Sequence, residues 1–352
     1  MSEILRMSNR QAEESLKQIR RQIHDKYSFC MLDFQKNESV GNGFVESEYD
    51  HIDGAAIGIK ELRSDPQSDP KLRLSDEEYR EAPVDDYYYM CALVTEFHEL
   101  THIAHAKSTI YKRDPSSSLV MIGKMVDSAS TVYYEKNYHI MPHEISAQYS
   151  GIRNAHKLLT EKLGSEKADA LVCDYVNKHK KDEFIDFPEN GEYTNVDDIF
   201  DAYDKAFRNS KTAKRELNFD DIEATIQKFK NNEISPFEQP DYLVKYLMQH
   251  EGEKQALKDI MQTKSGIEQD MFVAKTYLFA TDPKGKIRKQ LASLKAVDFG
   301  EAGVTKEDTK VDYAARFLKG QYITSDHINP LYIDDTTYDF AKDVDNNNLD
   351  LF

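Results

Sequence analysis

The sequence contains no tryptophan and only three cysteines, and it has no apolar run long enough to cross a bilayer. Cys30, Cys91 and Cys173 lie far apart and form no Cys-x-x-Cys pair, so neither a disulfide framework nor a thiolate metal site is indicated. Such cysteine usage is typical of a reducing compartment. The residues from Met1 to Arg6 also lack the apolar core of a signal peptide. We therefore expect a cytoplasmic protein that does not enter a membrane.

Basic residues are scarce relative to acidic ones. The chain has 46 Lys and Arg against 63 Asp and Glu, which gives a formal net charge of −17. Proteins that hold the phosphate backbone of nucleic acids need clustered Lys and Arg to displace its counterions. The short basic runs at 178–181 and 284–289 are flanked by acidic or apolar residues and are typical of a solvated surface. We expect no direct binding of nucleic acid.

The chain is predicted to be mainly α with a small β element. Its 352 residues exceed the usual size of a single core, which favours two domains, at 1–165 and 166–333. Gly-, Val- and Ile-rich runs between Asn37 and Leu62 predict a hairpin or meander. The acidic, Asn-rich residues 334–352 predict a disordered tail. Helices are predicted at 8–27, 86–107, 117–136, 142–163, 166–181, 196–212, 219–231, 240–262 and 266–279, the first capped by Ser8 and the fourth begun by Pro142.

The segment from His98 to His102 reads His-Glu-Leu-Thr-His, the HExxH arrangement. Two histidines four residues apart on a helix lie on the same face and can direct both imidazoles at one metal ion. Glu99 lies one step round the helix, where it can take a proton from water without being a ligand. The surrounding residues are helical in pattern and strongly apolar. This favours a true metal site, because a chance occurrence of HExxH on a solvated helix would not have apolar neighbours.

A catalytic zinc site needs a third protein ligand and one open position. His105 lies too close to His102 on the same helix to complete a tetrahedral set, and the metzincin pattern is absent. The predicted helix 142–163 offers Glu144, with His143 as the runner-up. Glu144 lies above a strip of small residues at helical spacing, which would let a second helix approach closely: Ala147, Gly151 and Ala155. We therefore choose Glu144.

These two elements resemble the gluzincin-type metallopeptidase domains of mobile genetic elements, such as the ImmA/IrrE-type and ArdC-type zincins. Those domains pair an HExxH helix with a later helix carrying an ExxA segment, here the residues from Glu144 to Ala147, and the resemblance covers about 60 of the 352 residues. It implies a zincin-like domain over 1–165, with His98, His102 and Glu144 as zinc ligands and Glu99 as general base.

Hydrolysis of a peptide bond also requires a donor that stabilises the tetrahedral oxyanion. Tyr138 and His139 are the candidates that we select for this role. Other tyrosines nearby are possible donors, although most of the 21 tyrosines in the chain must be packing residues: Tyr133, Tyr134 and Tyr149.

Three alternatives stay open at this point. A buried histidine pair can be part of a hydrogen-bonded core without metal, or the site can hold a structural or silent zinc ion. The chain can also be a non-catalytic helical accessory protein of a mobile element.

The chain ends with Asn348-Leu349-Asp350-Leu351-Phe352 on its acidic tail. Three apolar residues on a polar segment favour one of two arrangements: they dock into a pocket of a partner protein, or they pack back against the chain's own domain. The peptide resembles the bacterial sliding-clamp-binding motif, with Asn348 where Gln is usual. The resemblance implies a clamp as a partner through Leu349, Leu351 and Phe352.

Overall fold

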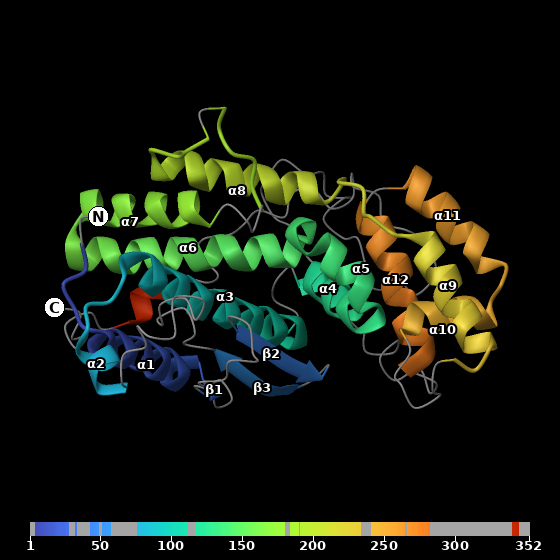
Figure 1. Ribbon diagram of the computed structural model, residues 1–352, viewed down its shortest axis with the longest axis horizontal. Helices are drawn as coiled ribbons and strands as arrows, with labels where there is room; N and C mark the ends of the chain where they lie inside the picture. Colours follow the sequence, from blue (N-terminus) through green and yellow to red (C-terminus); the bar gives the residue numbers. More distant parts are fainter. Residues whose placement is uncertain are drawn as a thin grey trace. The chain divides into compact units, whose positions relative to one another are not determined.

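The computed structural model describes residues 4–27, 32–33, 43–48, 51–57, 76–111, 117–179, 184–189, 191–233, 241–264, 266–281 and 340–344. Helices dominate these residues, and a small three-stranded sheet accompanies them (Figure 1). The prediction of a mainly α fold with a small β element is confirmed. None of the described helices combines the length and the apolar character that a membrane span requires.

Contacts between Cα atoms divide the chain into two units. Unit 1 comprises Met1–Ala106, Ser146–Asp204 and Ile333–Phe352, and unit 2 comprises Lys107–Ile145 and Lys205–Tyr332. Each unit is therefore assembled from separate stretches of sequence. The domains predicted at 1–165 and 166–333 are contiguous, so the two divisions do not coincide.

Unit 1 is a layered helical structure. Figure 1 shows α3 beside α1 on one side and α6 on the other, with α7 next to α6. Its helices are α1 (Asn9–Tyr27), α2 (Asp76–Glu81), α3 (Asp86–Tyr111), α6 (Pro142–Leu163), α7 (Ser165–Lys178) and α8 (Val196–Ser210), of which α3, α6 and α8 continue into unit 2 as unbroken helices. Most residues of α3 up to Thr101 are buried, which makes α3 the central helix of the unit.

Local signals explain where these helices begin and end. The Ser8 backbone N–H donates to Gln11 Oε1 at 2.8 Å, and the Gln11 N–H donates to Ser8 Oγ at 3.3 Å, so the two residues form a reciprocal cap at the start of α1. The prediction of Ser8 as the cap is confirmed. Pro142 begins α6 as predicted, and Gly164, just past its end, has a positive φ of 85°.

Polar contacts as well as apolar packing join α1 to α3. Arg20 on α1 makes a bidentate pair with Glu96 on α3, at 2.8 Å from Nε to Oε1 and 2.5 Å from Nη2 to Oε2, and both side chains are buried. The hydroxyls of Ser15 and Tyr89 lie 3.0 Å apart in the same interface. Both helices also bury apolar side chains fully: Leu16, Ile19 and Ile23 on α1, and Met90, Leu93 and Phe97 on α3.

The sheet consists of β1 (Leu32–Asp33), β2 (Gly43–Glu48) and β3 (His51–Ile57), in the order β1-β3-β2. Strands β2 and β3 pair antiparallel, with a register irregularity between Glu46 and Ser47, and β1 pairs parallel to β3. The hairpin predicted between Asn37 and Leu62 is therefore present.

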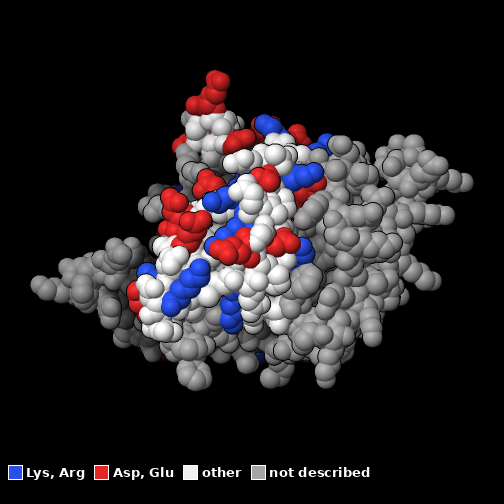
Figure 2. All heavy atoms as spheres, turned by 90° about the vertical axis from the view of Figure 1, so that its right-hand side faces the viewer, with Lys and Arg blue, Asp and Glu red and all other residues white. Residues whose placement is uncertain are grey.

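Unit 2 contains α4 (Ser117–Ala129), α5 (Thr131–Asn137), a 3-10 turn η3 (Tyr138–Ile140), α9 (Phe219–Lys230), α10 (Tyr242–Gln249), α11 (Glu253–Thr263) and α12 (Gly266–Thr281). A buried ion pair between Arg215 and Asp270 organises its core, and the Tyr133 hydroxyl donates to Asp270 Oδ1 at 2.9 Å. Lys and Arg are intermingled with Asp and Glu over the described residues visible in Figure 2.

Two helices predicted as continuous are each divided in unit 2. The predicted helix 117–136 breaks at Ser130, whose extended backbone lets its Oγ accept the Tyr133 N–H and cap α5. The predicted helix 240–262 breaks at 250–252, between α10 and α11. Capping and turn formation outweighed the helical pattern at both places.

Residues 340–344 correct the prediction of a disordered tail over 334–352. Phe340, Ala341 and Val344 are buried in unit 1, and Ala341–Asp343 form a 3-10 turn, η6. The ring of Phe340 stacks on that of Phe97, with centroids 6.3 Å apart. The prediction was wrong for 340–344 because it rested on the average composition of 334–352, which is acidic. That range includes a short apolar segment that packs in the core.

Candidate metal centre

His98 and His102 face one another on α3, as their spacing predicts. Their Nε2 atoms lie 2.9 Å apart, and their ring centroids are separated by 4.7 Å. Two nitrogens that bind one zinc ion at 2.0–2.1 Å in tetrahedral geometry would be about 3.3 Å apart. His98 is buried and His102 is half-buried, so the pair lies at the edge of the core.

The small-residue strip on α6 brings this helix against α3. A Cβ atom added to Gly151 would lie 2.7 Å from the carbonyl oxygen of Val94 and 3.4 Å from the backbone nitrogen of His98. Ala147 and Ala155, on either side of Gly151, are fully buried. The predicted close approach of the second helix is confirmed, and it occurs beside the first histidine.

Gln148 on α6 holds the first histidine. Its Oε1 lies 3.0 Å from His98 Nδ1, and its Nε2 donates to the Tyr175 hydroxyl of α7 at 3.1 Å. An amide oxygen accepts from Nδ1–H, which leaves Nε2 of His98 with the lone pair that a metal ligand needs. Sequence reasoning missed Gln148, although its position one turn after Glu144 was a usable signal.

Glu144 lies one turn before Gln148 on the same unbroken helix, α6. The two histidines of α3 and the Glu144 carboxylate form a group whose potential ligand atoms all lie within 4.8 Å of one another. Two imidazoles and one carboxylate are the donor set of a catalytic zinc site of the thermolysin kind. The structure thus brings together the three residues that were predicted as metal ligands.

Glu144 has two further partners close by. The Tyr134 hydroxyl of α5 donates to Glu144 Oε1, and His143 Nε2 lies 3.1 Å from the same oxygen. Burial raises the pKa of Tyr134 well above its usual range, and the charge of Glu144 raises it further, so the phenol keeps its proton. Tyr134 therefore acts as a donor that orients the carboxylate.

Two other histidines, His143 and His105, were considered as the third ligand from the sequence. His143 is buried, and its ring occupies the space that a side chain at Gly123 would need. The converging group contains Glu144 and not His143. The His105 side chain lies outside the residues whose side chains are described.

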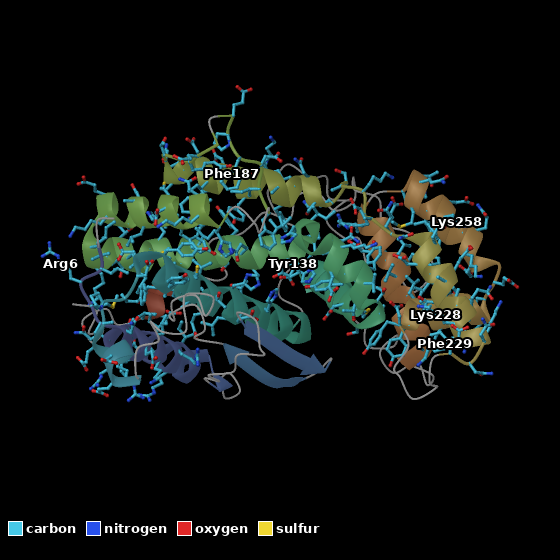
Figure 3. The ribbon with its side chains drawn as sticks, in the orientation of Figure 1. Arg6, Tyr138, Phe187, Lys228, Phe229 and Lys258 are labelled. Carbon is cyan, nitrogen blue, oxygen red and sulfur yellow. The ribbon has the colours of Figure 1, made fainter. Side chains whose placement is uncertain are left out.

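The predicted catalytic residues lie on α3 and in η3. Glu99 follows His98 on α3, is buried, and is not part of the converging set. Tyr138, labelled in Figure 3, and His139 lie half-buried in η3. The Tyr138 ring contacts those of Tyr134 and His139 edge-on, at 5.7 and 5.2 Å between centroids.

Two other tyrosines that were possible oxyanion donors have packing partners. Tyr133 is fully buried against Asp270. Tyr149 is buried beside Phe200 and Tyr203, and its hydroxyl accepts from Arg153. Among the tyrosines considered, Tyr134 makes the contact with a predicted ligand, so its importance was underestimated from the sequence.

No family model matches the chain, and no curated protein or solved structure is significantly similar to it. The resemblance to gluzincins therefore stays a prediction that rests on the residues of the site. The terminal peptide 348–352 lies outside the described residues.

Proposed function

We propose that the protein is a zinc-dependent peptide hydrolase of the gluzincin type. His98, His102 and Glu144 would hold the ion, and Glu99 would be the general base. One observation carries the proposal: two imidazoles on α3 and a carboxylate on α6 converge within 4.8 Å. This is the ligand set that the HExxH segment requires and cannot supply alone.

Each residue of the site would have a separate role in the hydrolysis. A zinc ion bound there would supply a Lewis acid and make hydroxide available near neutral pH. Glu99 would accept the proton of the attacking water and pass it to the amine that leaves. Tyr138 and His139, which adjoin Tyr134 in one aromatic cluster, are the proposed donors to the oxyanion. Gln148 and Tyr134 would keep the ligands His98 and Glu144 in their orientations.

The competing proposal is a non-catalytic accessory protein in which the same residues form a hydrogen-bonded core or a silent zinc site. The contact between His98 and His102 is compatible with a catalytic site, a silent zinc site and a metal-free hydrogen-bonded core. A silent site binds zinc without hydrolysis, and a hydrogen-bonded core binds none. In either case the expected cytoplasmic location stays a prediction from the sequence.

Metal analysis of the full chain, combined with point variants, tests the proposal. The wild-type protein should retain about one zinc ion per chain after dialysis and should cleave a fluorescently labelled unfolded protein. Glu99→Gln should keep zinc and lose hydrolysis because an amide cannot accept the proton. His102→Ala should lose the metal itself.

Glu161→Gln, at an exposed position on α6, is the matched control and should behave as wild type. A wild-type chain without zinc would contradict the proposal outright. Undiminished hydrolysis in Glu99→Gln would remove Glu99 from the role of base.

A further inference from the structure

A chain of buried hydrogen bonds begins in the middle of the HExxH segment. The hydroxyl of Thr101, between the two histidines, lies 2.7 Å from the carbonyl oxygen of Phe97 and 2.7 Å from Ser150 Oγ on α6. Thr101 is fully buried. The hydroxyl therefore ties the turn that carries both histidines to the facing helix.

The chain continues along α6 through Asn154. Its Nδ2 donates to the Ser150 carbonyl at 2.9 Å and lies 3.3 Å from Ser150 Oγ. Its Oδ1 accepts the backbone N–H of Ala341 at 2.9 Å. Both ends of the amide are matched to partners of the correct kind, so the orientation of Asn154 is determined by the network.

The far end of the chain is the segment Phe340–Val344, which we name the clip. Ala341 is 187 residues from Asn154 in sequence, yet the two meet in the core of unit 1. Phe340 stacks on Phe97, the residue that directly precedes His98. The clip thus contacts α3 at Phe97, next to the first histidine, and α6 at Asn154, one turn after Ser150.

We propose that the clip, acting through Asn154 and Ser150 on Thr101, is a positioning element for the metal centre. The inference rests on the proposed function, since it concerns the same site. A metal ion requires its ligands to be placed within tenths of an ångström, and buried polar networks define such positions because any other arrangement leaves a group without its partner. The clip fixes the spacing of α3 and α6, and this spacing determines where the two imidazoles point.

A purely structural clip would stabilise unit 1 without affecting metal affinity. Zinc affinity, measured by competition with a chromophoric chelator well below the unfolding temperature, separates the two roles. Asn154→Ala and Ser150→Ala should each weaken zinc binding about 10-fold, the lower end of the effect of removing groups that orient metal ligands. Thr101→Val, which removes only the hydroxyl, should do the same.

Ser15→Ala is the matched control, because it removes a buried hydroxyl contact between α1 and α3 of the same unit, outside this network. It should lower the unfolding temperature of the metal-free protein and leave zinc affinity unchanged. Combining Thr101→Val with Asn154→Ala should give less than the product of the two single effects, since both break one chain of bonds.

The outcomes distinguish this inference from the proposed function. A wild-type chain that binds no zinc contradicts the proposed function itself. A wild-type chain that binds zinc, with Asn154→Ala equal to it in affinity, overturns only the positioning role. Loss of affinity in Ser15→Ala in proportion to its loss of stability would also overturn the positioning role.

Discussion

His98 Nδ1 lies 3.0 Å from Oε1 of Gln148, so the first histidine of the HExxH segment is oriented by a residue of the helix that carries Glu144. Gln148 is in turn held by the Tyr175 hydroxyl, at 3.1 Å. The lone pair of His98 Nε2 is thereby directed toward the side where His102 lies. The orientation of this predicted ligand therefore depends on its hydrogen-bonding partner as well as on its position on α3.

Gln148→Ala should therefore weaken zinc binding about 10- to 100-fold, since the imidazole loses the acceptor that fixes its tautomer. Gln148→Glu keeps an acceptor at the same place and should lose less. Tyr175→Phe, which removes only the support of Gln148, should have the smallest effect. Competition titration with a chelator measures all three, and equal affinity in Gln148→Ala and wild type would contradict the assignment.

Neighbouring residues at the start of α6 provide a test of the third ligand. Glu144→Ala should lose most of the zinc affinity, whereas His143→Ala should retain most of it, because the converging group contains Glu144 and not His143. Both side chains are buried, so they are matched for the cost of truncation. Zinc content after dialysis decides the order, and a larger loss in His143→Ala would move the ligand by one residue.

Much of this centre was predictable because it depends on local periodicity. Residues four apart on a helix share a face, which predicted the pairing of His98 and His102. The same geometry predicted a strip of small residues after Glu144, and Gly151 lies at the close approach to α3. Ser8 and Pro142 determine helix starts through contacts within a few residues.

Long-range contacts were not predictable in this way. Nothing in the local pattern indicates that Phe340 stacks on Phe97, or that Asn154 accepts the Ala341 N–H. The division into units made of separate stretches has the same cause, since it depends on which helices pack together. The break at Ser130 is a local feature, because its side chain caps α5. The apolar pattern of 117–136 continues across this position and therefore did not predict the break.

Gly151→Ala should destabilise the fold by about 1–3 kcal/mol, the usual cost of overpacking. The added Cβ would lie 2.7 Å from the backbone oxygen of Val94, which cannot move without shifting α3. Gly252→Ala is the matched control, because no heavy atom beyond the adjacent residues of the chain lies within 4 Å of its Cβ position, and its φ of −64° suits alanine. Urea unfolding measures both, and equal stability in the two variants would contradict the close approach.

The proposed partner of residues 348–352 is testable by pull-down with a bacterial sliding clamp. The full chain should bind, and the double variant Leu351→Ala/Phe352→Ala should not, because a few apolar anchors carry most of the affinity of such peptides. Phe187→Ala, a change to a half-buried aromatic residue elsewhere, is the control. Clamp binding unchanged in the double variant would contradict the proposal.

Two truncations of the C-terminal segment should differ strongly in their effect on stability. Removing 346–352 leaves the clip intact, and the sequence predicts these residues to be a disordered tail. A disordered tail contributes little to stability, so the unfolding temperature should stay nearly unchanged. Removing 340–352 deletes the buried Phe340, Ala341 and Val344, uncovers Phe97 and deprives Asn154 Oδ1 of its donor. Loss of one buried phenylalanine alone costs about 3–5 kcal/mol, so this chain should unfold at a much lower temperature. Thermal unfolding of the metal-free proteins measures the difference without reference to the metal centre. An equal loss in both truncations would show that the stabilising contacts lie beyond Val344, and no loss in either would show that the clip is not part of the core.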